Sequence, residues 1–207
     1  MKKIMLMIVG VIFISIISYP QYPTEAPLYR ASLENDSLTA PNRYEFDIVI
    51  KHTGGGSPFE CQGIQIGLTF NQKISNRDSL IAEYIEGTSE FEQQQTPTHL
   101  AISRTSSDTG VFKVAPKAIL EKGKGTIIPP NGKRYGRFRI STKADSFKPN
   151  EPINLNWNFS NTMGKYPTKI STFITEDESA NIVKAREITV NSNHINLLKV
   201  RKTKGSK

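Results

Sequence analysis

Metal binding and nucleophilic catalysis most often use histidine and cysteine, and this chain has few of either. It contains three histidines, His52, His99 and His194, and a single cysteine, Cys61. No two histidines stand at H-x-x-x-H or comparable spacing, and one cysteine cannot build a zinc site or an intrachain disulfide. We therefore expect no metal and no cofactor, and we interpret the histidines as ordinary strand-end or tail residues.

Two other patterns would suit a hydrolase. Ser106-Ser107-Asp108 combines a nucleophile with an acid, but Ser and Asp cluster in turns for backbone reasons, and no G-x-S-x-G elbow or P-loop occurs. Carboxylates gather over Glu83–Glu92 and in Thr175–Glu178, where a glycosidase would need two at a fixed separation. The second group could also offer oxygen ligands to Ca²⁺, although it lacks the EF-hand pattern. Their polar neighbours favour solvated loops, so we assign no catalytic residue.

Aromatic side chains matter for sugar binding because a ring face can stack on a pyranose. Trp157 is the only tryptophan, and its alternation with Leu155 and Phe159 predicts a core position. Tyr135 and Tyr166 lie beside turns and outside the clearest alternating sets. They are the candidate ligand-binding residues, with Tyr166 the better one, although packing over a sheet edge is the favoured interpretation of each.

The elements that must position these residues are strands. Apolar and polar residues alternate over 44–51, 64–71 and 153–159, which predicts strands with one buried face. Three such strands need a second sheet to cover their apolar faces. Further strands are expected at 28–33, 80–85, 99–103, 110–115, 126–128, 134–141, 170–174 and 182–190.

Turn-forming residues separate these segments, and no segment shows a convincing helical period. Pro129–Lys133 contains Asn-Gly, which has the chemistry of a tight hairpin. The polar stretch Glu90–Gln95 predicts a surface loop. Short strands every 8–15 residues predict an all-β fold, a two-sheet β-sandwich or jelly roll.

The first residues predict an export signal. Lys2 and Lys3 precede an uncharged run from Ile4 to Ile17, which is shorter than the roughly 20 apolar residues that span a bilayer. Ser18 is a small residue at the expected cleavage position, so the mature chain would begin near Tyr19. An uncleaved anchor is the alternative. The expected organisation is a signal peptide at 1–18, a linker at 19–27, a β-sandwich at 28–192 and a basic disordered tail at 193–207.

The net charge of +8 comes mostly from the two ends of the chain. Lys2 and Lys3 lie in the signal, and five basic residues lie within the last nine. Removing these seven from the 27 basic residues leaves 20 against 19 acidic ones. Nucleic-acid binding needs a basic face on the fold, so we expect no nucleic-acid partner. Membrane contact is expected only through the tail.

The region 29–173 resembles secreted proteins of Bacteroidetes and related bacteria that carry a β-sandwich of the cohesin and carbohydrate-binding-module type. The segments that carry the resemblance occur in the family's order and rough spacing: 29–35, 44–48, 58–60, 65–68, 113–117, 125–128 and 166–170. The resemblance implies a cohesin-like sandwich and export, and it brings no catalytic residues. Many relatives continue into a sorting domain for type IX secretion, which is not expected here.

Together these features predict a noncatalytic binding or adhesion module of the cell envelope, located in the periplasm, at the cell surface or outside the cell. Its ligand would be a polysaccharide or another protein. The alternative is a glycoside hydrolase on a jelly roll. Asp36-Ser37-Leu38 and Asp78-Ser79-Leu80 resemble the short motif that Bacteroidetes use for O-glycosylation, which makes Ser37 and Ser79 candidate modification sites.

Overall fold

The computed structural model describes residues 27–53, 58–76, 80–104, 108–159, 166–175, 183–188 and 195–196. In these ranges the chain forms strands and two short 3₁₀ turns, η1 (Gln72–Ile74) and η3 (Gln93–Gln95). The strands are β1 (Tyr29–Ala40), β2 (Arg43–His52), β3 (Phe59–Asn71), β4 (Leu80–Ile85), β5 (Pro97–Arg104), β6 (Thr109–Pro116), β7 (Thr126–Ile128), β8 (Lys133–Thr142), β9 (Leu155–Trp157), β10 (Lys169–Thr175), β11 (Val183–Ile188) and β12 (Ile195–Asn196).

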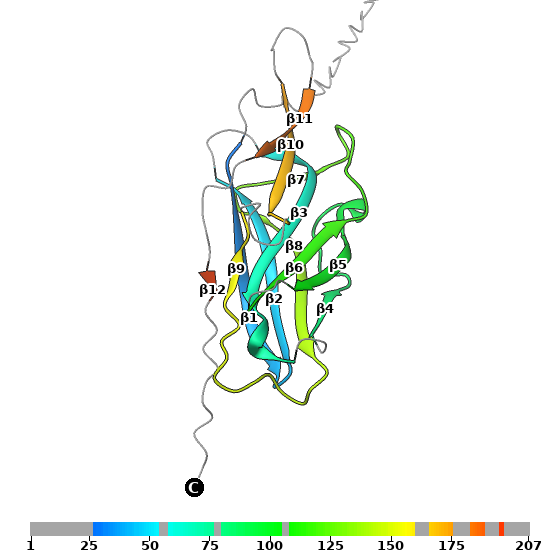
Figure 1. The fold of residues 1–207 in the computed structure, drawn as a ribbon. Helices are drawn as coiled ribbons and strands as arrows, with labels where there is room; N and C mark the ends of the chain where they lie inside the picture. Colours follow the sequence, from blue (N-terminus) through cyan, green and yellow to red (C-terminus); the bar gives the residue numbers. More distant parts are fainter. Residues whose placement is uncertain are drawn as a thin grey trace, which may run out of the picture.

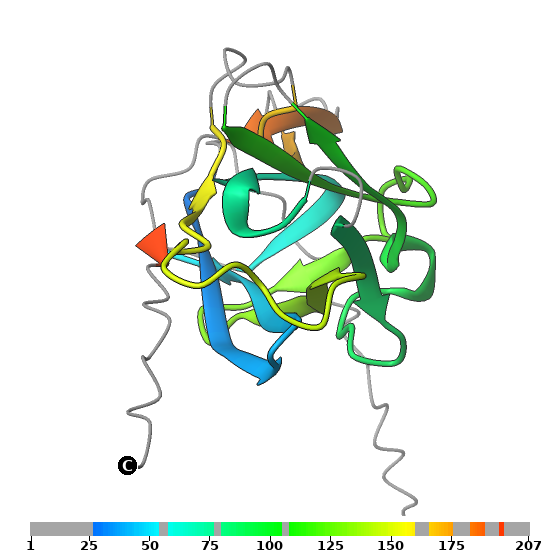
Figure 2. The same cartoon turned by 60° about the horizontal axis from the view of Figure 1, so that its bottom comes forward.

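The strands form two antiparallel sheets that face each other (Figures 1 and 2). One sheet has the order β1-β2-β8-β4, and the other has the order β11-β10-β3-β6-β5. The predicted fold class is therefore confirmed: the described chain is an all-β, two-sheet sandwich.

Strand β3 organises the second sheet, because different parts of its length pair with four other strands. Its first residues pair with β7, and Ile66–Asn71 pairs with β6. The middle of β3 pairs with β10, and Leu68 and Thr69 pair with β9. Strand β12 in turn pairs with β9. The outer face of this sheet is consequently assembled from segments far apart in sequence.

The core lies between the two sheets and is rich in aromatic rings. Phe46, Phe112 and Phe138 contact one another with ring centroids 5.7–6.0 Å apart. Trp157 is 8% exposed and stacks on Phe159, so its predicted core position is confirmed. Because buried aromatic rings remove large apolar areas from water, this cluster is a main source of stability.

One local expectation, the hairpin at Asn131-Gly132, was wrong. The Asn-Gly turn forms, with Gly132 at φ 85° and its N–H donating to the Pro129 carbonyl oxygen. The strands it joins do not pair, because β7 pairs with β3 and β8 pairs with β2 and β4. The turn therefore connects two sheets and closes no hairpin.

The segment Glu90–Gln95 lies at the surface as expected, with Glu90, Glu92, Gln93 and Gln94 exposed, but it also contributes buried side chains. Gln95 is fully buried, and its amide donates to the Cys61 carbonyl oxygen at 2.8 Å. Its Oε1 accepts from the Thr126 N–H and hydroxyl. These bonds satisfy the buried amide and fix the segment against β3 and β7.

The ends of the domain stay predictions. The signal sequence, the cleavage position and residues 19–26 of the linker lie outside the described residues, as do residues 197–207. Strand β12 pairs with β9 just beyond the expected boundary at residue 192. Within the described part of the chain, no helix is long and apolar enough to cross a membrane.

Candidate functional site

Tyr135 is not available to a ligand, which corrects its assignment as a candidate stacking residue. The residue is fully buried, and its ring packs edge-on against Phe91 with centroids 5.1 Å apart. The register of β8 against β2 shifts between Ile48 and Val49. Because such a bulge changes which side chains face inward, Tyr135 points into the core together with Phe138. This phase change also explains why it lies outside the alternating set in sequence.

Tyr166 is half-buried and lies on the outer face of the second sheet. Its hydroxyl donates to the Val114 carbonyl oxygen at 3.4 Å, and burial raises its pKa above the ordinary tyrosine value. The Lys113 ammonium lies 5.2 Å from the ring centroid. A ligand that stacked on this ring face would have to displace Lys113. Tyr166 stays a ligand-binding prediction.

Of the candidate modification sites and the histidines, the structure describes Ser37, His52 and His99. Ser37 is exposed on β1, beside a register shift, whereas Ser79 lies outside the described residues. His52 is buried against Phe59, and burial lowers its pKa. His99 is exposed on β5 and His194 lies outside the described residues. In the described part of the chain, no three His, Cys, Asp or Glu side chains lie close enough to hold a metal ion.

On the outer face of the β1-β2-β8-β4 sheet, acidic and basic side chains form a network of ion pairs. The Glu45 carboxylate lies 3.0 Å from Arg137 Nε and 2.8 Å from Arg139 Nη2. Asp47 lies 3.0 Å from Arg137 Nη1. Arg139 also reaches Glu83 on β4 at 3.4 Å. Neighbouring strands thus place acid opposite base, and the arginine side chains cover two carboxylates that the sequence pattern places in water.

These pairs do not suit acid–base catalysis. Burial alone would raise the pKa of Glu45, but hydrogen bonds from Arg139 and Arg137 outweigh it and lower that pKa. A glycosidase acid needs a raised pKa to hold its proton near neutral pH. Of the carboxylates considered in sequence, Glu83, Glu86, Glu90 and Glu92 are exposed, and residues 176–178 lie outside the described residues.

The outer face of the other sheet has different chemistry. The core-facing residues Ile64, Ile66 and Leu68 of β3 alternate with outward-facing Gln65, Gly67 and Thr69. Besides β11, the main strands of this sheet are β10, β3, β6 and β5. They contain one acidic residue, Glu60, which is 4% exposed and accepts a hydrogen bond from the Gly125 N–H.

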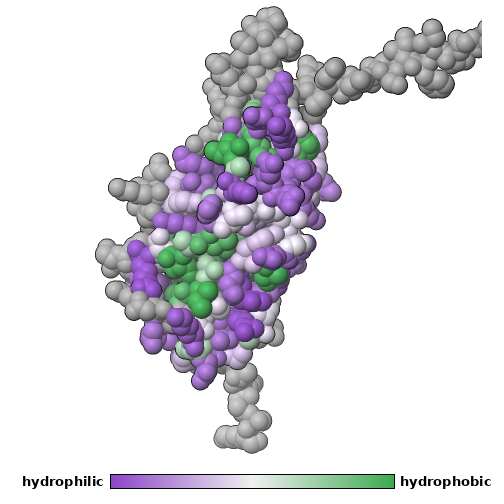
Figure 3. All heavy atoms as spheres, turned by 90° about the vertical axis from the view of Figure 1, so that its right-hand side faces the viewer, coloured by the Kyte–Doolittle hydropathy of each residue, from purple (hydrophilic) through white to green (hydrophobic). Residues whose placement is uncertain are grey.

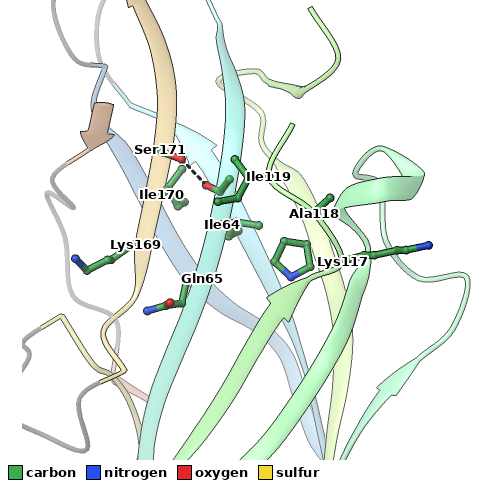
Figure 4. Close-up of a pocket in the computed structure, with 10 residues that line it drawn as sticks. Ile64, Gln65, Lys117, Ala118, Ile119, Lys169, Ile170 and Ser171 are labelled. Carbon is green, nitrogen blue, oxygen red and sulfur yellow. Dashed lines mark hydrogen bonds between the residues drawn. The ribbon is translucent and has the colours of Figure 1, made fainter. Parts of the chain in front are cut away.

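A groove of about 300 Å³ lies on this face, beside β3 and β10 (Figure 4). Ile119 is its most exposed large apolar residue, with 72% of its surface accessible. At Gly63 the backbone itself forms part of the groove, and the Gly63 carbonyl oxygen accepts a bond from Ser171 Oγ at 3.4 Å. Figure 4 shows Lys117 and Lys169 on opposite sides. We call this the β3 groove; its ten lining residues are Gly63–Gln65, Pro116–Ile119 and Lys169–Ser171.

Exposed apolar surface also occurs on the side of the molecule where β4 and β5 lie. Figure 3 shows two hydrophobic areas there within a mostly hydrophilic surface. On β4, Ile81 is 39% exposed, and Leu80 and Ala82 pack partly against the core. Ile119 lies on the loop between β6 and β7.

Sequence reasoning missed the β3 groove. Ile119, the exposed apolar residue of the groove, lies in a loop, where periodicity says nothing about exposure. The floor of the groove is Gly63, which has no side chain. The available clue was Ala118-Ile119-Leu120, an apolar run bounded by Lys117 and Glu121 in a segment without strand alternation. Only the pairing of β3 with β10 shows that this loop adjoins Lys169–Ser171.

A scan against protein-family models finds no match to this chain, and a search of the curated proteins finds none either. Solved structures show distant similarity. One is the endoglucanase CelQ from Clostridium thermocellum with cellotetraose, at 9% identity and a TM-score of 0.37, covering 76% of this chain and 24% of that one. The chain thus spans about a quarter of the endoglucanase's length.

Two further similar structures are type II cohesins from Acetivibrio cellulolyticus. The second cohesin module of the adaptor ScaA scaffoldin has 8% identity and a TM-score of 0.34, covering 72% of this chain and 80% of that module. The cohesin–X-dockerin complex of ScaB and ScaA has 9% identity and a TM-score of 0.34, covering 70% of this chain and 86% of that one. The fold assignment rests on the strand pairing described above.

Proposed function

We propose that this chain is an exported, noncatalytic binding module that holds a protein or a polysaccharide at the cell envelope or outside the cell. Binding takes place on the outer face of the β11-β10-β3-β6-β5 sheet, at the β3 groove. The module acts by adhesion, and it needs no cofactor. Ser37 and Ser79 are its proposed O-glycosylation sites.

The observation that carries this proposal is the 72% exposure of Ile119 at the rim of a groove with a bare backbone floor. Leaving a large aliphatic side chain in water forgoes about 1.5–3 kcal/mol that burial would supply. A partner that covers Ile119 recovers this free energy. Single exposed apolar residues are common, so the coincidence of Ile119 with the groove gives the proposal its weight.

The charge pairing on the opposite face supports the choice of sheet. There each buried carboxylate lies within 3.0 Å of an arginine, so a ligand would have to break existing pairs. The β3 groove contains no acidic residue among its ten lining residues, so binding there disrupts no ion pair with a lining carboxylate.

The export step is part of the proposal. The signal at residues 1–18 is removed, and the mature chain begins near Tyr19 and works in the periplasm, at the cell surface or outside the cell. N-terminal sequencing of envelope material should give a sequence that starts near Tyr19. Recovery of Met1 would contradict cleavage and favour an N-terminal anchor.

A glycan array and an affinity pull-down with the mature chain test the binding function. Ile119→Asp should abolish capture of whatever the unmodified chain retains, because a charge replaces the apolar anchor. Leu38→Asp is the matched control, since Leu38 is 38% exposed on the opposite sheet. Equal capture by the Ile119 variant would move the binding site away from the β3 groove.

A further inference from the structure

Strands β10, β3, β6 and β5 of the second sheet contain fewer acidic residues than the opposite sheet does. Strands β1, β2 and β4 contain Glu34, Asp36, Glu45, Asp47 and Glu83. Strands β10, β6 and β5 contain none, and β3 contains only the buried Glu60. These four strands therefore carry no exposed carboxylate, and the acidic residue of the neighbouring strand β11 is Glu187.

Basic residues remain on this acid-poor face. Lys113 projects from the outer side of β6, since it alternates with the buried Phe112 and Val114. Lys117 and Lys169 line the β3 groove on its two sides. Lys113 and Lys117 are cationic groups on this face, and cationic groups favour a negatively charged partner through complementarity and faster encounter.

The same face offers little to a sugar ring. Saccharide recognition commonly uses an open aromatic platform, and the ring on this face is Tyr166, which has Lys113 over it. The anchor at the groove is aliphatic, and an aliphatic side chain of a polypeptide packs against Ile119 better than a hydroxylated ring does. Between the two ligand classes, the side chains favour a polypeptide.

We propose that the β3 groove binds an acidic polypeptide segment, with an aliphatic side chain of that segment on Ile119 and its carboxylates beside Lys113 and Lys117. This inference rests on the proposed function and names the partner's chemistry. The floor at Gly63 lets the partner approach closely, because a side chain at that position would fill the space beside Ser171 and Ile119.

The affinity of the proposed contact should depend on ionic strength, on the lysines and on Ile119. Lysine–carboxylate attraction at an exposed rim is screened as ionic strength rises, whereas packing on Ile119 is not. Reversing one lysine should weaken binding roughly tenfold, and Ile119→Asp should weaken it by more than about tenfold.

A random 12-residue peptide library selected on the immobilised mature chain tests the inference, followed by fluorescence anisotropy of the enriched peptides at 50 and 300 mM NaCl. We expect enriched peptides rich in Asp or Glu with Leu, Ile or Val. They should bind Lys117→Glu and Ile119→Asp weakly and bind Lys143→Glu normally. Lys143 is the matched control because it is exposed just beyond the end of β8. Replacing the peptides' acids with amides should also weaken binding.

The outcomes separate the two proposals. Peptides that depend on Ile119 but carry no excess of acids would overturn the acidic-partner inference and leave the binding site standing. Peptides unaffected by Ile119→Asp would overturn the site itself. Polygalacturonate is the saccharide arm of the same assay. If it competed more strongly than the peptides and depended on Lys117 but not on Ile119, the partner would be an acidic polysaccharide, and the polypeptide assignment would be wrong.

Discussion

At the scale of single residues, the pairing of Glu45 with two arginines stabilises one sheet and depends on pH. Hydrogen bonds from Arg139 and Arg137 hold the folded-state pKa of Glu45 below its ordinary value of 4.5. A group with a depressed folded pKa contributes stability above its unfolded pKa and loses it as pH falls through the folded pKa. The contribution of this pair is therefore complete above about pH 4.5 and declines below it.

The Glu45→Gln variant tests this assignment. Removing one partner leaves two arginines in a largely covered site without their shared carboxylate, so the free energy of unfolding at pH 7 should fall by on the order of 3 kcal/mol. Urea denaturation at pH 7 and pH 3 should show a smaller loss of stability with acid in the variant than in the parent chain. An equal loss in both would assign the acid sensitivity to other carboxylates.

The contribution of Trp157 to the stability of the core can be tested directly by substitution. This residue is 8% exposed and stacks on Phe159, so Trp157→Ala should cost about 3–5 kcal/mol of unfolding free energy. The indole N–H has no hydrogen-bond partner among the described residues. Deleting an unpaired buried donor recovers part of the cost, so we expect the lower end of this range. Chemical denaturation measures it, and a loss below 1 kcal/mol would contradict the core assignment.

At the scale of elements, β3 and the loop before β10 are locked together at Gly67. The Gly67 N–H donates to Thr168 Oγ1 at 3.0 Å, and the Gly67 carbonyl oxygen accepts from the Asn158 N–H at 2.9 Å. A Cβ at this position would lie 1.9 Å from the Tyr166 carbonyl oxygen. The close approach is between backbones, so no side-chain rotation can relieve it.

Gly67→Ala should consequently lower stability by about 2–3 kcal/mol, in the range of overpacking substitutions. It should also change the environment of Tyr166, which tyrosine fluorescence or NMR can detect. Gly87→Ala is the control: nothing lies within 4 Å of its added Cβ, and only the left-handed backbone at φ 75° costs energy, about 1 kcal/mol. Similar losses in the two variants would show that the Gly67 contact is looser than described.

Strand positions could be predicted from sequence because alternation reports directly on which face is buried. The prediction was weaker where a bulge changes the phase, as at Tyr135, or where an ion pair covers an acid, as at Glu45 and Asp47. The β3 groove could not be predicted, since it joins a loop, a glycine and a distant strand. No local pattern encodes the pairing of β3 with β10 that brings them together.

At the scale of the whole molecule, the C-terminal segment divides into a part that pairs and a part that we predict to be a disordered basic tail. Strand β12 pairs with β9, so deletion of residues 193–207 should lower the melting temperature. A loss of about 1 kcal/mol corresponds to roughly 2–4 °C for a domain of this size. Deletion of residues 197–207 should leave it unchanged, because charged residues with little apolar surface do not repay the entropy of ordering.

The same deletions test the expected membrane contact of the tail. Each basic residue near an anionic surface contributes about 1 kcal/mol of attraction, which salt weakens. Vesicle co-sedimentation at low salt should therefore decrease when residues 197–207 are removed. Unchanged sedimentation would remove the membrane role, and a large drop in melting temperature for this shorter deletion would place the tail on the sandwich.

The central claim is that ligands bind on the outer face of the sheet built on β3. Hydrogen–deuterium exchange of the mature chain, measured with and without a captured ligand, tests it most directly because it reports on every strand at once. We predict added protection at Gly63–Gln65, at Pro116–Ile119 and at Lys169–Ser171, with no change in β1, β2, β8 and β4. Protection confined to β1, β2, β8 and β4, with the β3 groove unchanged, would contradict the account.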